Sequence, residues 1–325
     1  MFNINTLVQP RIVDELFECY YRGENGVREL SSHWRHYASL IKCDLDRSGR
    51  MRLSAGSGLG CTQQGSAADR LVSAICRLSY MNRVKERDDV RYLSKKAAAN
   101  IRKIGSYLSY DFFRQIVSFV CIRRHLDRTP DGLRGDVLMI GDGYGFLSAL
   151  IKSVYPQARI ALVDIGKILI FQAVNIQTIF PFCRHALISD GGAGPGSHDN
   201  ADFVYCPADR LDLLRGMRYR LIINISSMQE MEMKVINRYF DIMRSSTGEG
   251  YFYSCNRVER ELQKGIYIRT IDYPWHKKDE IVVDELCPWY QKLPSSRPPF
   301  SKPPKGPYHH RLVKLYRAKA EVNFS

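Results

Sequence analysis

The hydrophobic pattern over the first part of the chain has the period of a helix. Apolar side chains recur at every third or fourth position in residues 11–47, 67–83 and 88–128, and this spacing predicts helices. A stretch rich in glycine and serine at residues 48–66 predicts a loop between the first two segments. The turn sequence Thr-Pro-Asp-Gly then marks a boundary, so we expect an all-helical N-terminal region over residues 1–130.

From residue 131 onward, short apolar runs alternate with helical stretches. The predicted strands are Val137–Ile140, Arg159–Val163, Phe203–Tyr205, Tyr219–Ile225 and Gly250–Tyr253. The predicted helices are Gly145–Val154, Lys167–Phe180, Asp209–Arg215 and Glu230–Arg244. Ile266–Thr270 and Arg311–Tyr316 are candidates for late strands, including an antiparallel edge pair. This alternation predicts an α/β fold with a parallel sheet and right-handed crossovers over residues 131–325.

Three alternating glycines follow the first predicted strand. The segment reads Gly141, Asp142, Gly143, Tyr144 and Gly145. Glycines let the backbone turn tightly and approach a ligand closely, and Asp164, which ends the second strand, can accept hydrogen bonds from both hydroxyls of a ribose. The pattern therefore predicts a site for an adenosine-containing cofactor. Because Phe146 stands where a dinucleotide fingerprint needs its last glycine, a nicotinamide or flavin cofactor is disfavoured.

Polar residues also follow the third and fourth predicted strands. Ligands of open parallel sheets bind beyond the carboxyl ends of the strands, so we expect these residues to face one crevice. Asp209, which follows Ala208, either accepts the adenine amino group or serves only as a helix N-cap. After Asn224, Ser227 and Glu230 either line a pocket or form a capping box.

A wider set of motifs resembles one enzyme family. The motifs are Ile140–Gly145, Val163–Ile165 with Leu169 and Gln172, Asn224 with Ser227, Gln229–Met231 and Tyr253–Arg257. Over roughly residues 135–316 they resemble the sugar O-methyltransferases of bacterial polysaccharide and natural-product clusters. The resemblance implies a Rossmann-like class I methyltransferase sheet. It also implies methyl transfer from S-adenosylmethionine to a sugar hydroxyl of a glycan, nucleotide sugar or glycosylated natural product. The implied cofactor ligands are Gly141, Asp142, Gly143, Tyr144, Gly145, Asp164, Ile165, Ala208, Asp209 and Asn224.

One position departs from the family pattern. Many methyltransferases carry an acid two residues before the first glycine, where it helps to hold the methionine ammonium group, and this chain has Met139 there. Asp142 is the candidate that replaces this acid from another direction. A non-catalytic binding protein with a degenerate methyltransferase fold is therefore an alternative.

The reaction that the resemblance implies needs a group that takes a proton from the acceptor hydroxyl. The candidate bases are Glu230, His276, His309 and His310. His276 follows Trp275 in a loop whose aromatic rings either stack on a sugar or simply anchor the loop. His309 and His310 precede the last predicted strand and are otherwise plain strand-end residues.

Two further candidates concern charged ligands. Arg257, at the end of a predicted strand, either binds a phosphate or uronate of the acceptor or pairs with a surface acid. His33 and His36 have helical spacing, but no nearby pair of carboxylates completes a ligand set, so we predict no metal site there. A divalent metal is an alternative to a base, without support from a clear ligand set.

The composition bears on partners and compartment. The 325-residue chain has a net charge of +14, which attracts anions such as nucleic acid, acidic lipids or phosphorylated small molecules. The resemblance implies a sugar or anionic glycan as the acceptor, with nucleic acid as the second choice. The nine cysteines are scattered without a Cys-x-x-Cys motif, which favours reduced thiols and a cytoplasmic location. We find no apolar run long enough for a membrane span and no signal-peptide pattern.

The basic charge supports an alternative function, a nucleic-acid methyltransferase that uses the basic surface. Against it, the chain lacks the Asn/Asp-Pro-Pro-Tyr/Phe motif of amino-methylating DNA enzymes and a paired catalytic cysteine motif. The N-terminal helical region, residues 1–130, is the candidate for acceptor binding or for the contact of a homo-oligomer. Residues 131–325 are expected to bind S-adenosylmethionine.

Overall fold

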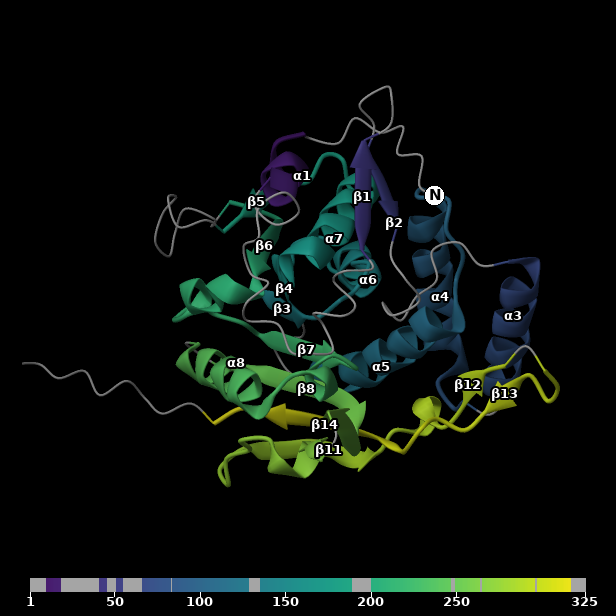
Figure 1. Cartoon of the computed structure of the whole chain (residues 1–325). Coiled ribbons are helices and arrows are strands. Elements are labelled where there is room, and N and C mark those ends of the chain that lie inside the picture. The colour runs from purple at the N-terminus through teal and green to yellow at the C-terminus, as the bar shows by residue number, and fades with distance from the viewer. Residues whose placement is uncertain are drawn as a thin grey trace, which may run out of the picture.

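An eight-stranded sheet forms the centre of the molecule (Figure 1). The computed structural model describes residues 10–18, 41–45, 51–54, 66–82, 84–128, 135–188, 200–246, 249–263, 265–295 and 297–316. The strands, in spatial order, are β11 (Glu280–Leu286), β14 (Tyr308–Lys314), β8 (Tyr251–Arg257), β7 (Leu221–Ile225), β3 (Val137–Ile140), β4 (Ile160–Asp164), β6 (Phe203–Pro207) and β5 (His185–Leu187). The run from β8 to β5 is parallel, whereas β14 is antiparallel to both of its neighbours. The predicted α/β fold is confirmed.

Helices cover both faces of the sheet (Figure 1). The α-helices are α1 (Pro10–Phe17), α3 (Ala67–Met81), α4 (Arg87–Arg102), α5 (Tyr110–Leu126), α6 (Phe146–Val154), α7 (Gly166–Ile179) and α8 (Met233–Ser245). The 3₁₀ helices are η3 (Ala208–Leu214), η4 (Met228–Glu230), η5 (Thr270–Asp272) and η6 (Pro288–Tyr290). Buried side chains of α1 and of α3 to α7 pack on one face, and those of α8 and η3 pack on the other.

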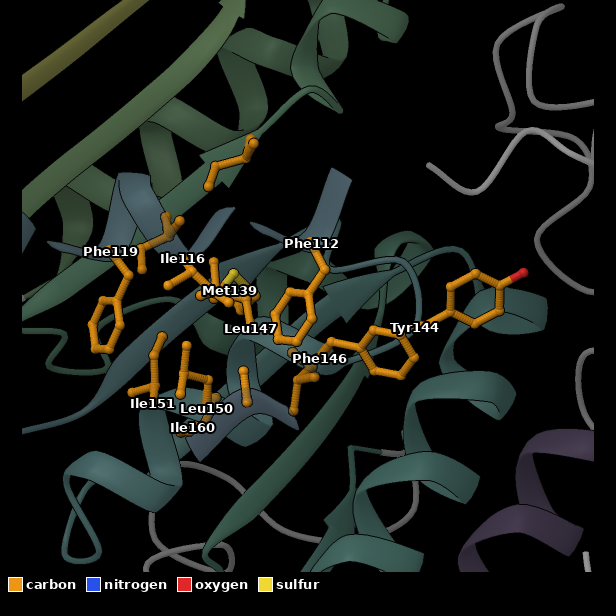
Figure 2. Packing of buried hydrophobic residues seen from close by; sticks show 14 of the residues in the cluster. Phe112, Ile116, Phe119, Met139, Tyr144, Phe146, Leu147, Leu150, Ile151 and Ile160 are labelled. Carbon is orange, nitrogen blue, oxygen red and sulfur yellow. The ribbon is translucent and has the colours of Figure 1, made fainter. Parts of the chain in front are cut away.

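The face under α5 and α6 carries a dense apolar cluster, shown in Figure 2. Phe112 and Ile116 of α5 lie over Leu147 of α6 and the strand residue Met139. Met139 is only 2% exposed, because alternate residues of β3 point to opposite faces and this position points at the helices. The side chain that departs from the family pattern is therefore a core residue.

The N-terminal region differs from the all-helical expectation. Strands β1 (Lys42–Leu45) and β2 (Met51–Ser54) form an antiparallel hairpin in which Leu45 pairs with Met51. In each strand apolar and polar residues alternate, which is the period of a strand rather than of a helix. His33 and His36 lie outside the described residues.

The C-terminal part adds short antiparallel pairs around the main sheet. The pairs are β9 (Glu259–Gln263) with β10 (Ile266–Arg269), and β12 (Leu293–Pro294) with β13 (Ser301–Lys302). Both predicted late strands exist, but β10 pairs outside the main sheet while β14 lies within it. Within the described ranges, no helix has the length and apolar character required to cross a membrane.

Candidate functional site

The glycine loop joins β3 to α6 at the carboxyl edge of the parallel strands. Gly141, Gly143 and Gly145 all have positive φ angles, of 75°, 58° and 79°. Such angles place the backbone in the left-handed region, where a side chain is strained. A Cβ on Gly141 would also stand 2.2 Å from Oγ of Ser227, so the loop packs directly against the segment after β7.

Asp142, inside the loop, caps α6. Its carboxylate accepts hydrogen bonds from the backbone N–H groups of Leu147 (3.3 Å) and Ser148 (2.9 Å). A carboxylate at this place is favoured by the helix dipole. Burial nevertheless raises the pKa of Asp142 to about 6, with the bonds from Ser148 and Leu147 opposing the rise. These contacts give Asp142 a structural task in holding the loop on the helix.

Asp164 ends β4 beside the loop. One carboxylate oxygen accepts the N–H of Ile165 (2.8 Å) and the other accepts the amide of Gln172 (2.7 Å). Burial raises the pKa of Asp164 to about 7, and the charge of Asp142 adds to the rise, while the N–H of Gly143 is among the bonds that oppose it. Together with Ile165 and Gln172, Gly143 occupies three of the about four lone-pair sites of the carboxylate, so one acceptor site is left for a hydroxyl donor.

Tyr144 forms an aromatic wall next to the loop. Its ring stacks on Phe146 with centroids 5.7 Å apart (Figure 2). It also meets Phe171 of α7 edge-on at the same distance. The backbone carbonyl of Tyr144 accepts the amide of Asn175 at 2.9 Å. Two helices thus hold the conformation of the glycine loop.

Ala208 and Asp209 lie directly beyond β6, next to Asp164. Pro207, the last residue of β6, is the register partner of Asp164. The N-cap of η3 is Pro207, so the interpretation of Asp209 as the N-cap is wrong. Asp209 lies in the first turn of η3 and is half-buried.

Asn224 is placed at the site but has no hydrogen-bonding group left for a ligand. Its Nδ2 donates to the carbonyl of Ile140 (3.1 Å) and to Oγ of Ser227. Its Oδ1 accepts from the N–H of Met228 (3.2 Å) and from Nδ2 of Asn256 (2.9 Å). Two donors and two acceptor sites are the capacity of this amide, so the side chain is fully occupied, which disfavours a direct contact of it with the cofactor. Asn224 ties β3 to β7 and β8.

The segment after β7 forms no side-chain capping box. Oγ of Ser227 donates to the carbonyl of Ile140 at 3.2 Å and makes no cap bond to η4. Ser226, before it, has a φ of 63°, and its buried Oγ has no hydrogen-bond partner. Glu230 forms an ion pair with Arg260 at 2.8 Å, and both side chains are mostly buried. This pairing disfavours Glu230 as a base.

His309 lies at the carboxyl edge, because β14 runs antiparallel and begins there. It is paired in register with Asn256, near the end of β8. Its Nε2 lies 2.6 Å from Oδ1 of Asp284. Burial lowers the pKa of His309, although the Asp284 carboxylate opposes the effect, so the ring is neutral at pH 7. The neighbouring His310 is fully buried in contact with Trp289 and belongs to the core.

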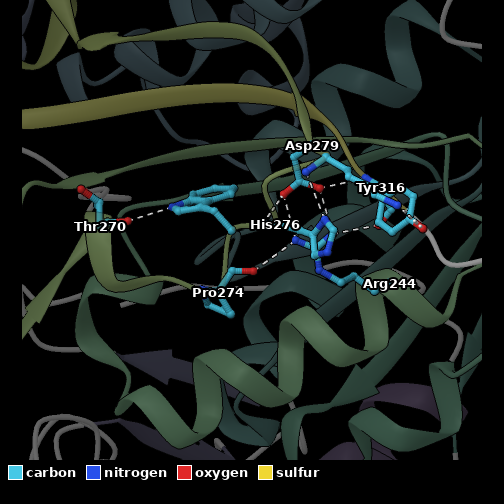
Figure 3. Close-up of polar contacts among 8 residues, drawn as sticks. Arg244, Thr270, Pro274, His276, Asp279 and Tyr316 are labelled. Atoms are coloured by element: carbon cyan, nitrogen blue, oxygen red, sulfur yellow. Dashed lines mark hydrogen bonds and ion pairs between the residues drawn. The ribbon is translucent and has the colours of Figure 1, made fainter.

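His276 lies beyond the opposite ends of the parallel strands. Its ring stacks on Tyr316 with centroids 4.7 Å apart (Figure 3). Tyr316 follows Lys314, which pairs with Tyr251, the first residue of β8. His276 therefore lies at the amino ends of the parallel strands, whereas the glycine loop lies at their carboxyl ends. At that separation His276 cannot act at the glycine loop. Asp279 fixes this corner by accepting bonds from Arg244 at 2.8 and 2.9 Å.

Sequence reasoning missed Arg114. It is the single cation within an apolar stretch of α5, between Phe113 and Ile116, and its side chain is only 7% exposed. A charge on the buried stripe of a helix was the signal that could have identified it. Among the described residues, no group of three or more His, Cys, Asp or Glu side chains is arranged to hold a metal ion.

Comparison with known proteins gives a likeness in fold only. No protein-family model and no curated protein sequence matches the chain. The pyocyanin biosynthetic protein PhzM is 11% identical, with a TM-score of 0.38, and the match covers 74% of this chain and 61% of PhzM. An O-methyltransferase family 2 protein from Planctomyces limnophilus, in complex with apigenin, is 11% identical, with a TM-score of 0.36 and coverages of 89% and 80%.

A SAM-dependent methyltransferase from Aquifex aeolicus is also similar, with 11% identity and a TM-score of 0.33 over 57% of this chain and 85% of that one. Because the match with PhzM covers 61% of that protein, this chain spans less than two thirds of its length. Since these TM-scores are below 0.5, the assignment of the site depends on the strand order and the contacts of this chain alone.

Proposed function

We propose that this chain is an S-adenosylmethionine-dependent O-methyltransferase that acts on a sugar hydroxyl. The supporting observation is the junction of β3 and β4, where a glycine loop with three positive φ angles meets the buried carboxylate of Asp164. Asp164 binds a ribose hydroxyl with its spare lone pair, Ile165 borders the adenosine, and the glycines leave room for the methionine part. Ala208 and Asp209 flank the adenine.

When bound, S-adenosylmethionine supplies an electrophilic methyl group on a sulfonium. The protein must align the acceptor oxygen with that methyl and accept the hydroxyl proton. His309 is the proposed base, since it is neutral, lies at the carboxyl edge and is oriented by Asp284 at 2.6 Å. In this scheme Asn224 and Asp142 position the loop rather than contact the methyl group.

The choice of a sugar as acceptor comes from the motif resemblance, and the positive charge of the chain favours an anionic one. We further propose that the helices within residues 1–130 form part of the acceptor side of the crevice. This placement agrees with the contact of Phe112 in α5 with Phe146, directly after the glycine loop, at a centroid distance of 5.4 Å.

Calorimetric titration with S-adenosylmethionine and S-adenosylhomocysteine tests the cofactor. We expect binding by the wild type and a loss of at least about tenfold in Asp164→Ala, equal to about 1.4 kcal/mol. Asp241→Asn, on the exposed face of α8, is the matched control and should bind normally. Equal affinities in Asp164→Ala and wild type would refute the assigned site, and absence of binding in all three would refute the proposed activity.

His309 is tested separately, with the sugar acceptor that gives the highest rate in a screen. His309→Gln should lower kcat for methyl transfer by about 10²-fold or more, in line with the loss of a general base. Its affinity for S-adenosylhomocysteine should stay unchanged. A normal kcat would exclude His309 as the base.

A further inference from the structure

Two guanidinium groups flank a pair of stacked tyrosines beside the proposed cofactor site. Tyr290 of η6 and Tyr308 of β14 stack with ring centroids 4.6 Å apart. Cζ of Arg114 lies 4.1 Å from the ring centroid of Tyr290, and Cζ of Arg257 lies 5.7 Å from that of Tyr308. We propose that this cluster is an acceptor subsite in which Arg257 binds a carboxylate or phosphate group of the acceptor. The inference deepens the proposed function and rests on it, because it takes the bound anion to be the methyl acceptor.

The cluster lies at the same edge of the sheet as the glycine loop. Arg257 is the last residue of β8, and its backbone N–H donates to Oε1 of Gln229 at 2.7 Å. The N–H of Gln229 in turn donates to Asn256 at 3.2 Å, and Asn256 is bonded to Asn224, which holds the carbonyl of Ile140. A continuous chain of hydrogen bonds therefore connects Arg257 with the residue before Gly141.

Arg114 approaches the same edge from the helical side. It lies two residues after Phe112, whose ring contacts Phe146 directly after the glycine loop. Trp289, next to Tyr290 in η6, donates its indole N–H to Oγ of Ser118 on α5 at 2.8 Å. The N-terminal half of α5 and the η6 turn are thus fixed together over the ends of β8 and β14.

Arg257 has an unused binding capacity. Its side chain is half-buried, its Nε is buried without a hydrogen-bond partner, and no carboxylate of the described residues forms an ion pair with it. The alternative expectation, that Arg257 pairs with a surface acid, is therefore wrong within the described part of the chain. A guanidinium presents a planar fork of N–H donors that matches the two oxygens of a carboxylate or phosphate.

Arg114 supports the subsite from the opposite side of the stack. Its side chain pairs with Asp111, yet its Nε and Nη1 are buried without partners. A buried cation with unsatisfied N–H groups is costly for the fold unless an acceptor is supplied. Arg114 fixes the face of Tyr290 by a cation–π contact and adds positive potential beneath the Tyr308–Arg257 pair. It is a positioning residue here.

Two classes of acceptor share this chemistry, a sugar that carries a carboxylate and a sugar that carries a phosphate. Glucuronic acid and glucose 6-phosphate represent the two, and glucose is the neutral control with the same ring. We would titrate each probe into the full chain by calorimetry, with and without saturating S-adenosylhomocysteine. The variants are Arg257→Gln, the charge-preserving Arg257→Lys, and the control Arg91→Gln, whose arginine is 57% exposed on α4.

We expect at least one anionic probe to bind about tenfold or more tightly than glucose, with a preference that falls as NaCl is added. Arg257→Gln should lose the preference, Arg257→Lys should keep a part of it, and Arg91→Gln should keep all of it. The stronger of the two anions identifies the source of the charge. Equal binding of all three probes, or an unchanged preference in Arg257→Gln, would overturn the subsite.

The titration with S-adenosylhomocysteine also separates the two proposals. A variant that still binds this ligand is folded, so a lost preference in Arg257→Gln is then specific. If the wild type binds S-adenosylhomocysteine but shows no preference for anions, the subsite is wrong and the proposed function stands. If it prefers anions but binds no adenosyl ligand, the anion site stands and the proposed function fails.

Discussion

Substitution of Gly141 by alanine tests the packing on which the proposed site depends. Gly141 combines a φ of 75° with a very close neighbour, since an added Cβ would stand 2.2 Å from Oγ and 2.5 Å from Cβ of Ser227. Neither group can move freely, because the Ser227 hydroxyl is bonded to Ile140 and Asn224. We expect the substitution to destabilise the protein.

The expected loss has two separable parts. A left-handed backbone costs an alanine about 1–2 kcal/mol relative to glycine. Overlap with a packed neighbour costs roughly a further 1–3 kcal/mol. Gly141→Ala should therefore lower the free energy of unfolding by about 2–5 kcal/mol.

Two comparisons in urea unfolding experiments separate the backbone cost from the cost of the overlap with Ser227. Gly216 has a φ of 78° and no atom within 4 Å of an added Cβ, so Gly216→Ala should show the backbone cost alone. Ser227→Gly removes the clashing atoms and leaves Cα of residue 227 at 4.0 Å, so the double mutant with Gly141→Ala should recover about 1–3 kcal/mol in the cycle. Equal losses in Gly141→Ala and Gly216→Ala, or strictly additive effects in the cycle, would refute the contact.

Three further outcomes are expected from the surroundings of Asp164, Asp279 and His276. The affinity for S-adenosylhomocysteine should rise about tenfold from pH 6 to pH 8, because the pKa of Asp164 is raised to about 7 and its ionised form accepts the stronger hydrogen bond from a ribose hydroxyl. A flat calorimetric profile would contradict this. Arg244→Met should lower the free energy of unfolding at pH 7 by about 3–5 kcal/mol, because Asp279 is 3% exposed and loses its ion partner. The pKa of Asp279 is lowered from 3.8, so the stability that this pair gives the wild type is lost as the pH falls through that pKa. The difference in free energy of unfolding between the wild type and Arg244→Met, measured by urea unfolding, should therefore narrow at such low pH. His276→Gln should leave the rate of methyl transfer within about twofold, and a loss of activity would refute its placement at the far edge of the sheet.

The sequence was sufficient to predict those elements whose structure is determined by a local pattern of residues. The strand at Val137–Ile140 is a short apolar run bounded by polar residues and glycine, and it is buried on both faces as such runs in parallel sheets are. The loop after it was predictable because alternating glycines permit a tight turn with positive φ angles, which other residues rarely adopt. The hairpin β1–β2 was missed because each of its strands has four residues and contributes only two apolar positions, too few for a period to be recognised.

Side-chain roles were less predictable, since the partners come from distant strands. Asn224 reads as a ligand-binding residue at a strand end, but Asn256, 32 residues later, takes up its acceptor. Glu230 reads as a base or as part of a capping box, but its charge is paired with Arg260, on β9. Both partners become visible only when the order of β7 and β8 in the sheet is known.

The direction of one strand decides which histidine is near the proposed site. From the sequence alone, His276 and His309 are equivalent, since each lies close to a late strand. Because β14 is antiparallel to β8, its first residues, and not its last, reach the carboxyl edge where the glycine loop lies. The same reversal sends Tyr316, and His276 stacked on it, to the opposite edge. It also brings Tyr308 next to Arg257, so the candidate base and the candidate anion subsite both depend on the polarity of β14.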